Sequence, residues 1–106
     1  MTPPVPARSE VWIADQVREA PAELRRQVLR DSAAITETDP LPDALAGAGW
    51  SALGRALARP SDRSVALDLL TADALITLAL LAQAEEHPED LGQFAERLVA
   101  VHSARA

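Results

Sequence analysis

Apolar residues recur along this chain at the three- and four-residue spacing of amphipathic helices, and no useful length alternates with the two-residue period of a strand. Prolines and short polar runs divide the pattern into about five helical segments. The first residues, MTPPVPAR, hold three prolines and show no apolar periodicity. We therefore expect an extended, flexible leader over residues 1–8 and a single helical domain over residues 9–106.

Each expected helix begins at a proline or at a polar residue able to cap it, and ends at the next such break. Pro21 and Pro88, for example, both fit the first position of a helix, where the missing N–H costs nothing. The runs TETDPLPD and RPSDRS are the clearest breaks in the chain. The expected helices cover about residues 9–19, 21–36, 42–58, 62–86 and 88 onwards.

The segment ALDLLTADALITLALLAQAEEHPED, which starts at Ala66, is the most apolar in the chain. Its large side chains fall on two opposite sides of one helix, and a helix that is apolar on two sides is usually buried. Two features argue against a membrane span. Asp68 and Asp73 interrupt the segment, and the uncharged stretch Ala74–Ala82 would rise only about 14 Å. We therefore predict an all-α fold, a small bundle of about five helices around a central apolar helix at about residues 62–86.

Two polar residues one turn apart, Asp73 and Thr77, lie on the narrow strip between those two apolar sides. A buried carboxylate is costly unless it is paired, and an arginine of a neighbouring helix could supply the pair. Asp73 and Thr77, with Arg55 and Arg59, are therefore the candidate ligand-binding residues. Alternatively, the strip reaches solvent at a seam of the bundle and Asp73 has no chemical role.

Two short motifs match known binding sequences but lack their context. GAGWSA, which starts at Gly47, fits the dinucleotide fingerprint, yet no strand precedes it, so its glycines are expected to let another helix approach closely. EEHPED gathers four carboxylates around His87, but neither histidine of the chain has a glutamate three positions before it, as di-iron bundles require. We predict no metal site, no cofactor and no catalytic residue.

Composition narrows the compartment and the class of partner. All ten basic residues are arginines and the formal charge is −6, which argues against nucleic acid as the main partner because counterion release needs clustered positive charge. The chain has no cysteine and no secretory signal at its start, so we expect a cytoplasmic protein. The absence of lysine indicates the codon bias of a GC-rich bacterial genome.

These patterns favour a non-catalytic helical-bundle protein that acts through protein–protein interaction, most simply by self-association as a homodimer. The reason is that a two-sided apolar helix has only short helices to cover it. The alternative is a small-molecule-binding or enzymatic bundle that uses a buried strip of Asp73 and Thr77 with an arginine partner. A third hypothesis, in which Arg55, Arg59 and Arg63 contact nucleic acid, is disfavoured by the acidic total charge.

Overall fold

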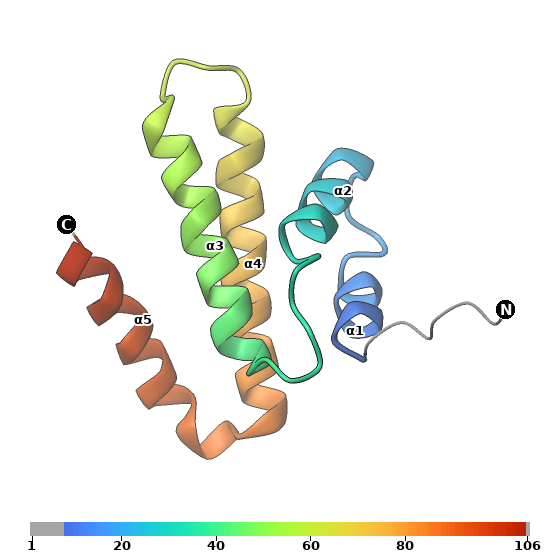
Figure 1. Ribbon diagram of the computed structural model, residues 1–106, viewed down its shortest axis with the longest axis vertical. Helices are drawn as coiled ribbons and strands as arrows, with labels where there is room; N and C mark the ends of the chain where they lie inside the picture. Colours follow the sequence, from blue (N-terminus) through green and yellow to red (C-terminus); the bar gives the residue numbers. More distant parts are fainter. Residues whose placement is uncertain (1–7, 106) are drawn as a thin grey trace, which may run out of the picture.

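The computed structural model describes the backbone of residues 8–105 and the side chains of residues 8–100. Every regular element in this part of the chain is a helix (Figure 1), which confirms the predicted all-α fold. The elements are α1 (Arg8–Gln16), α2 (Ala22–Asp31), α3 (Leu41–Ala58), α4 (Val65–Glu86), the short 3₁₀ helix η1 (Pro88–Asp90) and α5 (Leu91–Arg105).

Several boundaries differ from the expected ones; the first helix, for example, ends at Gln16 rather than near residue 19, and the fourth begins at Val65 rather than near residue 62. Arg8, assigned to the leader, is the first residue of α1, and the rest of the predicted leader lies outside the described residues.

The second helix ends at Asp31 rather than near Thr36. Its end coincides with Ser32, whose hydroxyl donates to the backbone carbonyl of Val28 at 2.8 Å. Beyond Ser32 the chain turns into the loop to α3, where the carboxylate of Asp39 accepts the backbone N–H of Thr36 at 2.8 Å. This side-chain hydrogen bond stabilises the loop in place of further helical turns.

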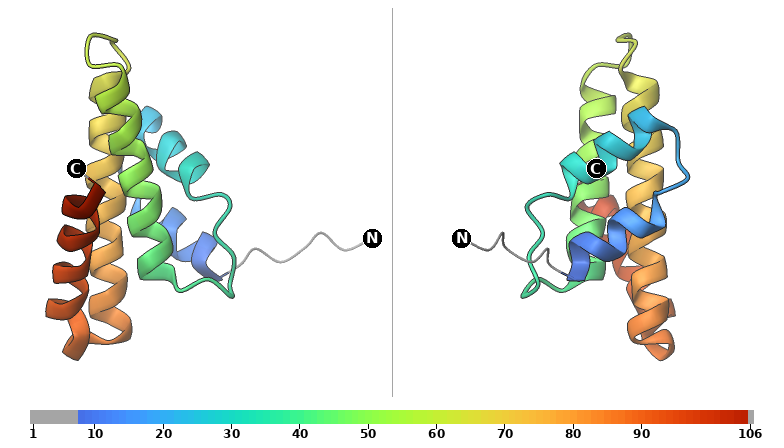
Figure 2. Two further views of the ribbon diagram at one scale, coloured as in Figure 1. Left: turned by 60° about the vertical axis from the view of Figure 1, so that its left-hand side comes forward. Right: turned by 90° about the vertical axis from the view of Figure 1, so that its right-hand side faces the viewer.

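Helices α3 and α4 form a long antiparallel pair joined by a short turn (Figures 1 and 2). In that turn the carboxylate of Asp62 accepts the backbone N–H of Ser64 at 2.9 Å, and this bond lowers the pKa of Asp62 below its ordinary value. The turn therefore satisfies a backbone donor just before α4 begins, as an Asx turn does.

Helices α3 and α4 approach each other closely at Gly49, within the GAGWSA motif. A Cβ atom built at Gly49 would lie only 2.7 Å from Cδ1 of Ile76, whereas Gly47 and Gly54 have nothing within 4 Å of such an atom. The motif lies within the helix α3 and not in a phosphate-binding loop. The packing role expected of its glycines is therefore found at Gly49 and not at the other two.

The remaining helices cover the α3–α4 pair from two sides. Helices α1 and α2 lie across one side of it, and α5 turns back after η1 to pack on another (Figure 2). Each contributes at least one fully buried apolar side chain to a common core: Ile13 from α1, Val28 from α2 and Phe94 from α5. These helices are short, so tertiary packing rather than intrinsic propensity must supply most of their stability.

Helix α4 packs against α2, α3, η1 and α5, which confirms its predicted place at the centre of the bundle. The expectation that both apolar sides are buried is wrong. The buried side is centred on Leu75, which lies between the two predicted apolar sides, while Leu69 of one predicted side and Leu70 and Leu81 of the other are exposed. The physical reason is that the neighbouring helices gather around the Leu75 side and none of the described elements covers the other. The buried residues of α4 are Thr71, Ala72, Leu75, Leu78, Ala79, Ala82 and Gln83.

By length and composition alone, α4 could also cross a membrane. It has 22 residues, and a third of its most apolar window is buried within the fold. The central helix of a water-soluble bundle meets the same two criteria. The sequence argument from Asp68 and Asp73 against a membrane span therefore remains a prediction.

Candidate functional site

Asp73 and Thr77, the predicted polar pair of the bundle core, lie on the exposed side of α4. At 100° per residue both point about 160° away from Leu75, the centre of the buried side. No hydrogen bond or ion pair joins Asp73 to another of the described residues. Of the two alternatives left open by the sequence, the buried, arginine-paired Asp73 disagrees with the structure, and the solvent-facing Asp73 agrees with it.

The arginine that does enter the bundle, Arg55 of α3, pairs with two other carboxylates. Its guanidinium donates to Asp31 at the end of α2 at 2.5 Å and to Asp68 in the first turn of α4 at 3.3 Å. The side chains of Asp31 and Asp68 are only 10% and 14% exposed. The hydrogen bond to Asp31 is the main reason that the pKa of Arg55 is raised. One arginine thus links three helices, and its guanidinium N–H groups are used in these two ion pairs.

Sequence reasoning missed Asp31 and Asp68 because both pairs join residues far apart in the chain. A signal for Asp68 was present: it precedes the buried Leu75 by seven residues, or about two turns, and so lies on the same side of α4. Arg59, the other candidate, is exposed just beyond the end of α3. The structure therefore does not bring the four predicted residues together into one site.

The acidic junction between α4 and α5 holds a small cluster of possible metal ligands. Side-chain atoms of His87, Glu89 and Asp90 lie within 4.8 Å of one another, and all three residues are exposed. His87 and Glu89 are 3.4 Å apart. Carboxylates at the start of a helix are stabilised by its dipole without any metal, so this cluster is explained by the junction itself.

The exposed side of α4 carries two groups of leucines on either side of Asp73 and Thr77, and we call this surface the outer strip. Leu69, Leu70 and Leu81 on this surface are 47%, 54% and 37% exposed. Large aliphatic side chains left in water on one helix face are typical of protein interaction sites. The outer strip consists of Ala66, Leu69, Leu70, Asp73, Thr77, Leu80, Leu81 and Ala84.

A shallow hollow of about 310 Å³ lies beside the outer strip, between α3 and α4. Its walls include Trp50 and Leu53 from α3 and Leu69 and Ile76 from α4. The small Gly49 lies at its edge, where α3 approaches α4 closely. The hollow is mostly apolar, and an aliphatic side chain from outside could fill it.

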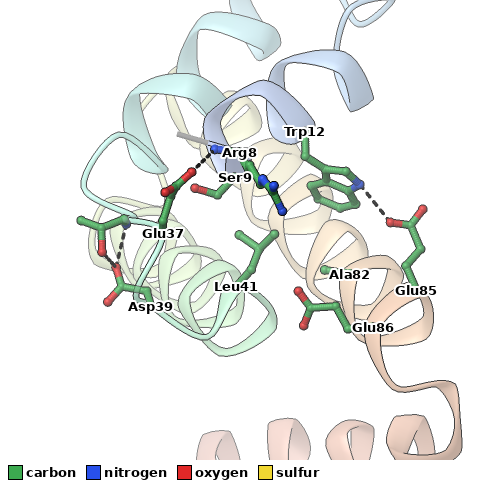
Figure 3. A pocket seen from close by; sticks show the side chains of 10 residues that line it. Arg8, Ser9, Trp12, Glu37, Asp39, Leu41, Ala82, Glu85 and Glu86 are labelled. Carbon is green, nitrogen blue, oxygen red and sulfur yellow. Dashed lines mark hydrogen bonds between the residues drawn. The ribbon is translucent and has the colours of Figure 1, made fainter. Parts of the chain in front are cut away.

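A cavity of about 580 Å³ lies beneath α1 and is bounded by the loop before α3 and the last turns of α4; we call it the α1 pocket (Figure 3). Trp12 forms part of its wall, and its indole N–H donates to Glu85 at 2.9 Å. The backbone N–H of Arg8 donates to Glu37 at 2.8 Å. Two hydrogen bonds between distant parts of the chain therefore connect the walls of the α1 pocket. No single segment of the sequence predicts this pocket.

Comparisons of the chain with protein-family models, with curated proteins and with solved structures give no match. The outer strip of α4 and the α1 pocket are the candidate functional surfaces among the described residues.

Proposed function

We propose that this protein acts through protein–protein interaction, as a homodimer in which the outer strip of α4 packs against the same strip of a second copy. No catalytic role is assigned to any residue. The observation that carries the proposal is the exposure of Leu69, Leu70 and Leu81 on the most apolar helix of the chain. Covering these side chains would remove apolar area from water, which is the main driving force of protein association.

A second copy is the favoured occupant because the outer strip is symmetric about its midpoint. In an antiparallel pair of α4 helices related by a two-fold axis at the level of Leu75, each residue faces one that lies about equally far on the other side of Leu75 and on the same flank of the strip. Leucine then faces leucine and alanine faces alanine, while Asp73 faces Thr77. The facing pairs are Ala66 with Ala84, Leu69 with Leu80, Leu70 with Leu81, and Asp73 with Thr77. Such self-complementarity is what a two-fold dimer interface requires.

The polar residues of the strip also favour the antiparallel arrangement. Asp73 of each copy would face Thr77 of the other, so that each hydroxyl could donate to a carboxylate across the interface. A parallel pair in register would instead place the two Asp73 carboxylates opposite each other, and like charges across an interface are costly. The two residues predicted as a ligand site thus gain a role in specifying the orientation of the dimer.

The hollow between α3 and α4 fits the same arrangement. It opens beside Leu69, the residue that would face Leu80 of the second copy. Leu80 could therefore enter the hollow and pack against Trp50 and Leu53, as a knob enters a hole between helices. The two-fold axis repeats this contact on the other side, so one pocket per chain would be filled.

Disulfide cross-linking tests both the dimer and its orientation, because the chain has no cysteine of its own. We expect a mixture of the variants Leu69→Cys and Leu80→Cys to form a covalent dimer under mild oxidation. Neither variant alone should cross-link efficiently, since identical positions would lie about 15–18 Å apart along the antiparallel helices, beyond the reach of a disulfide.

Leu57→Cys supplies the matched control, because Leu57 is an exposed leucine that lies on α3 outside the outer strip. Its mixture with Leu80→Cys should give only the background of random collisions. Efficient cross-linking of Leu69→Cys by itself would contradict the antiparallel arrangement. Equal cross-linking in the control mixture, or none in either mixture, would contradict the proposal that the outer strip is an interface.

A further inference from the structure

We propose that the α1 pocket binds a linear aliphatic diamine or polyamine, with one ammonium group at each end of the pocket. This site is separate from the outer strip of α4, and the inference does not depend on the proposed dimer. Four carboxylates line the pocket against a single guanidinium, which leaves a formal charge of −3. A cavity lined by one sign of charge attracts ligands of the opposite sign.

The carboxylates are divided between two ends of the pocket (Figure 3). Glu37 and Asp39, from the loop before α3, lie at one end, while Glu85 and Glu86, from the last turn of α4, lie at the other. Leu41 lies between them and provides an apolar contact. A chain of methylene groups with an amine at each end matches this order of acidic, apolar and acidic groups, whereas a small metal ion would contact one end only.

Trp12 provides a suitable surface for the ammonium group at the α4 end. Its indole N–H is held by the carboxylate of Glu85, which fixes the orientation of the ring at the pocket wall. The face of a tryptophan ring attracts a cation, and an alkylammonium group beside Trp12 could also donate to Glu86. No described residue forms a hydrogen bond or ion pair with the side chain of Glu86, so its oxygens can accept from a ligand.

The hydroxyl of Ser9 gives evidence for a bound ligand that is independent of the acidic residues. The residue is 8% exposed, and its buried hydroxyl has no hydrogen-bond partner. A buried hydroxyl without a partner is costly. Ser9 lines the pocket, and Figure 3 draws its hydroxyl on the side that faces Glu37. An ammonium group at that end would donate to both residues and satisfy the serine.

The side chain of Arg8 is the chain's own cation at this site, and Figure 3 shows it between Leu41 and Trp12. Arg8 is exposed and forms no ion pair among the described residues, so its flexible side chain can move aside when a ligand enters. Because Arg8 competes with the ligand for the carboxylates, Arg8→Gln should strengthen the binding of a diamine.

Isothermal titration calorimetry with putrescine tests the proposal, with butylamine and magnesium chloride as comparison ligands. We expect putrescine to bind at least about tenfold more tightly than butylamine, because the second charge gains its own hydrogen bonds. Glu37→Gln and Glu86→Gln should each weaken putrescine binding by about tenfold. Asp90→Asn, which removes an exposed carboxylate outside the pocket, should leave binding unchanged.

The variant Ser9→Ala distinguishes an effect on ligand binding from an effect on the stability of the fold. It should weaken putrescine binding several-fold while leaving the thermal midpoint of the free protein unchanged or higher, because it removes a buried group that has no partner. The proposal is overturned if putrescine does not bind, if butylamine or magnesium binds as tightly, or if Asp90→Asn has the same effect as Glu86→Gln. The latter two results would indicate only a general attraction between cations and an acidic surface.

Discussion

At the residue scale, the ion pairs of Arg55 are the polar contacts that join α2, α3 and α4. We expect Arg55→Ala to lower the free energy of unfolding by about 1–3 kcal/mol, since two largely buried carboxylates would lose their cation. Arg59→Ala, which removes an exposed arginine from the same helix end, should change it by less than about 0.5 kcal/mol. Urea melts of the two variants provide the comparison, and equal effects would contradict the structural role of Arg55.

Gly49 gives a second test of close packing, with Gly47 as its control in the same helix. Alanine is favoured over glycine in a helix by about 1 kcal/mol, so Gly47→Ala should stabilise the protein. Gly49→Ala should destabilise it by about 1–2 kcal/mol instead, because the new methyl group would overlap Ile76. Thermal melts should show midpoints that move in opposite directions. A gain in stability at both positions would contradict the close approach of α3 and α4.

At the scale of one element, α4 has two apolar sides that differ in what covers them. Leu75→Ala should cost about 2–5 kcal/mol at any protein concentration, because Leu75 is fully buried within the chain. Leu81→Ala should cost about 1 kcal/mol or less in dilute solution and more in concentrated solution, where a second copy would cover Leu81. Denaturant melts at two concentrations check this, and a large, concentration-independent cost at Leu81 would contradict the outer strip.

The helices themselves were largely predictable, because proline positions and apolar periodicity are local signals. The range of α4 and the break near Pro88 follow from them directly. Which side of α4 would be covered could not be predicted, since two apolar sides look alike in the sequence and only the placement of the other helices distinguishes them. The end of α2 was missed because Ile35 continued the apolar pattern beyond Asp31, where the helix ends.

At the scale of the whole molecule, the candidate sites depend on contacts that no local pattern encodes. The α1 pocket forms where α1, the loop before α3 and the end of α4 meet, and the bond from Trp12 to Glu85 joins residues 73 positions apart. Arg55 was singled out from the sequence, but its partners were not, because Asp31 and Asp68 belong to two other helices. Sequence reasoning therefore identified the fold class and the unusual helix, but not the surroundings of its polar residues.

The central claim is that the outer strip of α4 joins two copies of the chain, and sedimentation equilibrium tests it most directly. The unmodified protein should show the mass of two chains in concentrated solution and approach the mass of one on dilution. Leu70→Glu should remain monomeric at all concentrations with unchanged helical content, because it places a charge on the strip. Leu57→Glu, at an exposed leucine outside the strip, should dimerise normally. A monomeric unmodified protein, or a Leu70→Glu variant that dimerises as well as Leu57→Glu, would contradict the claim.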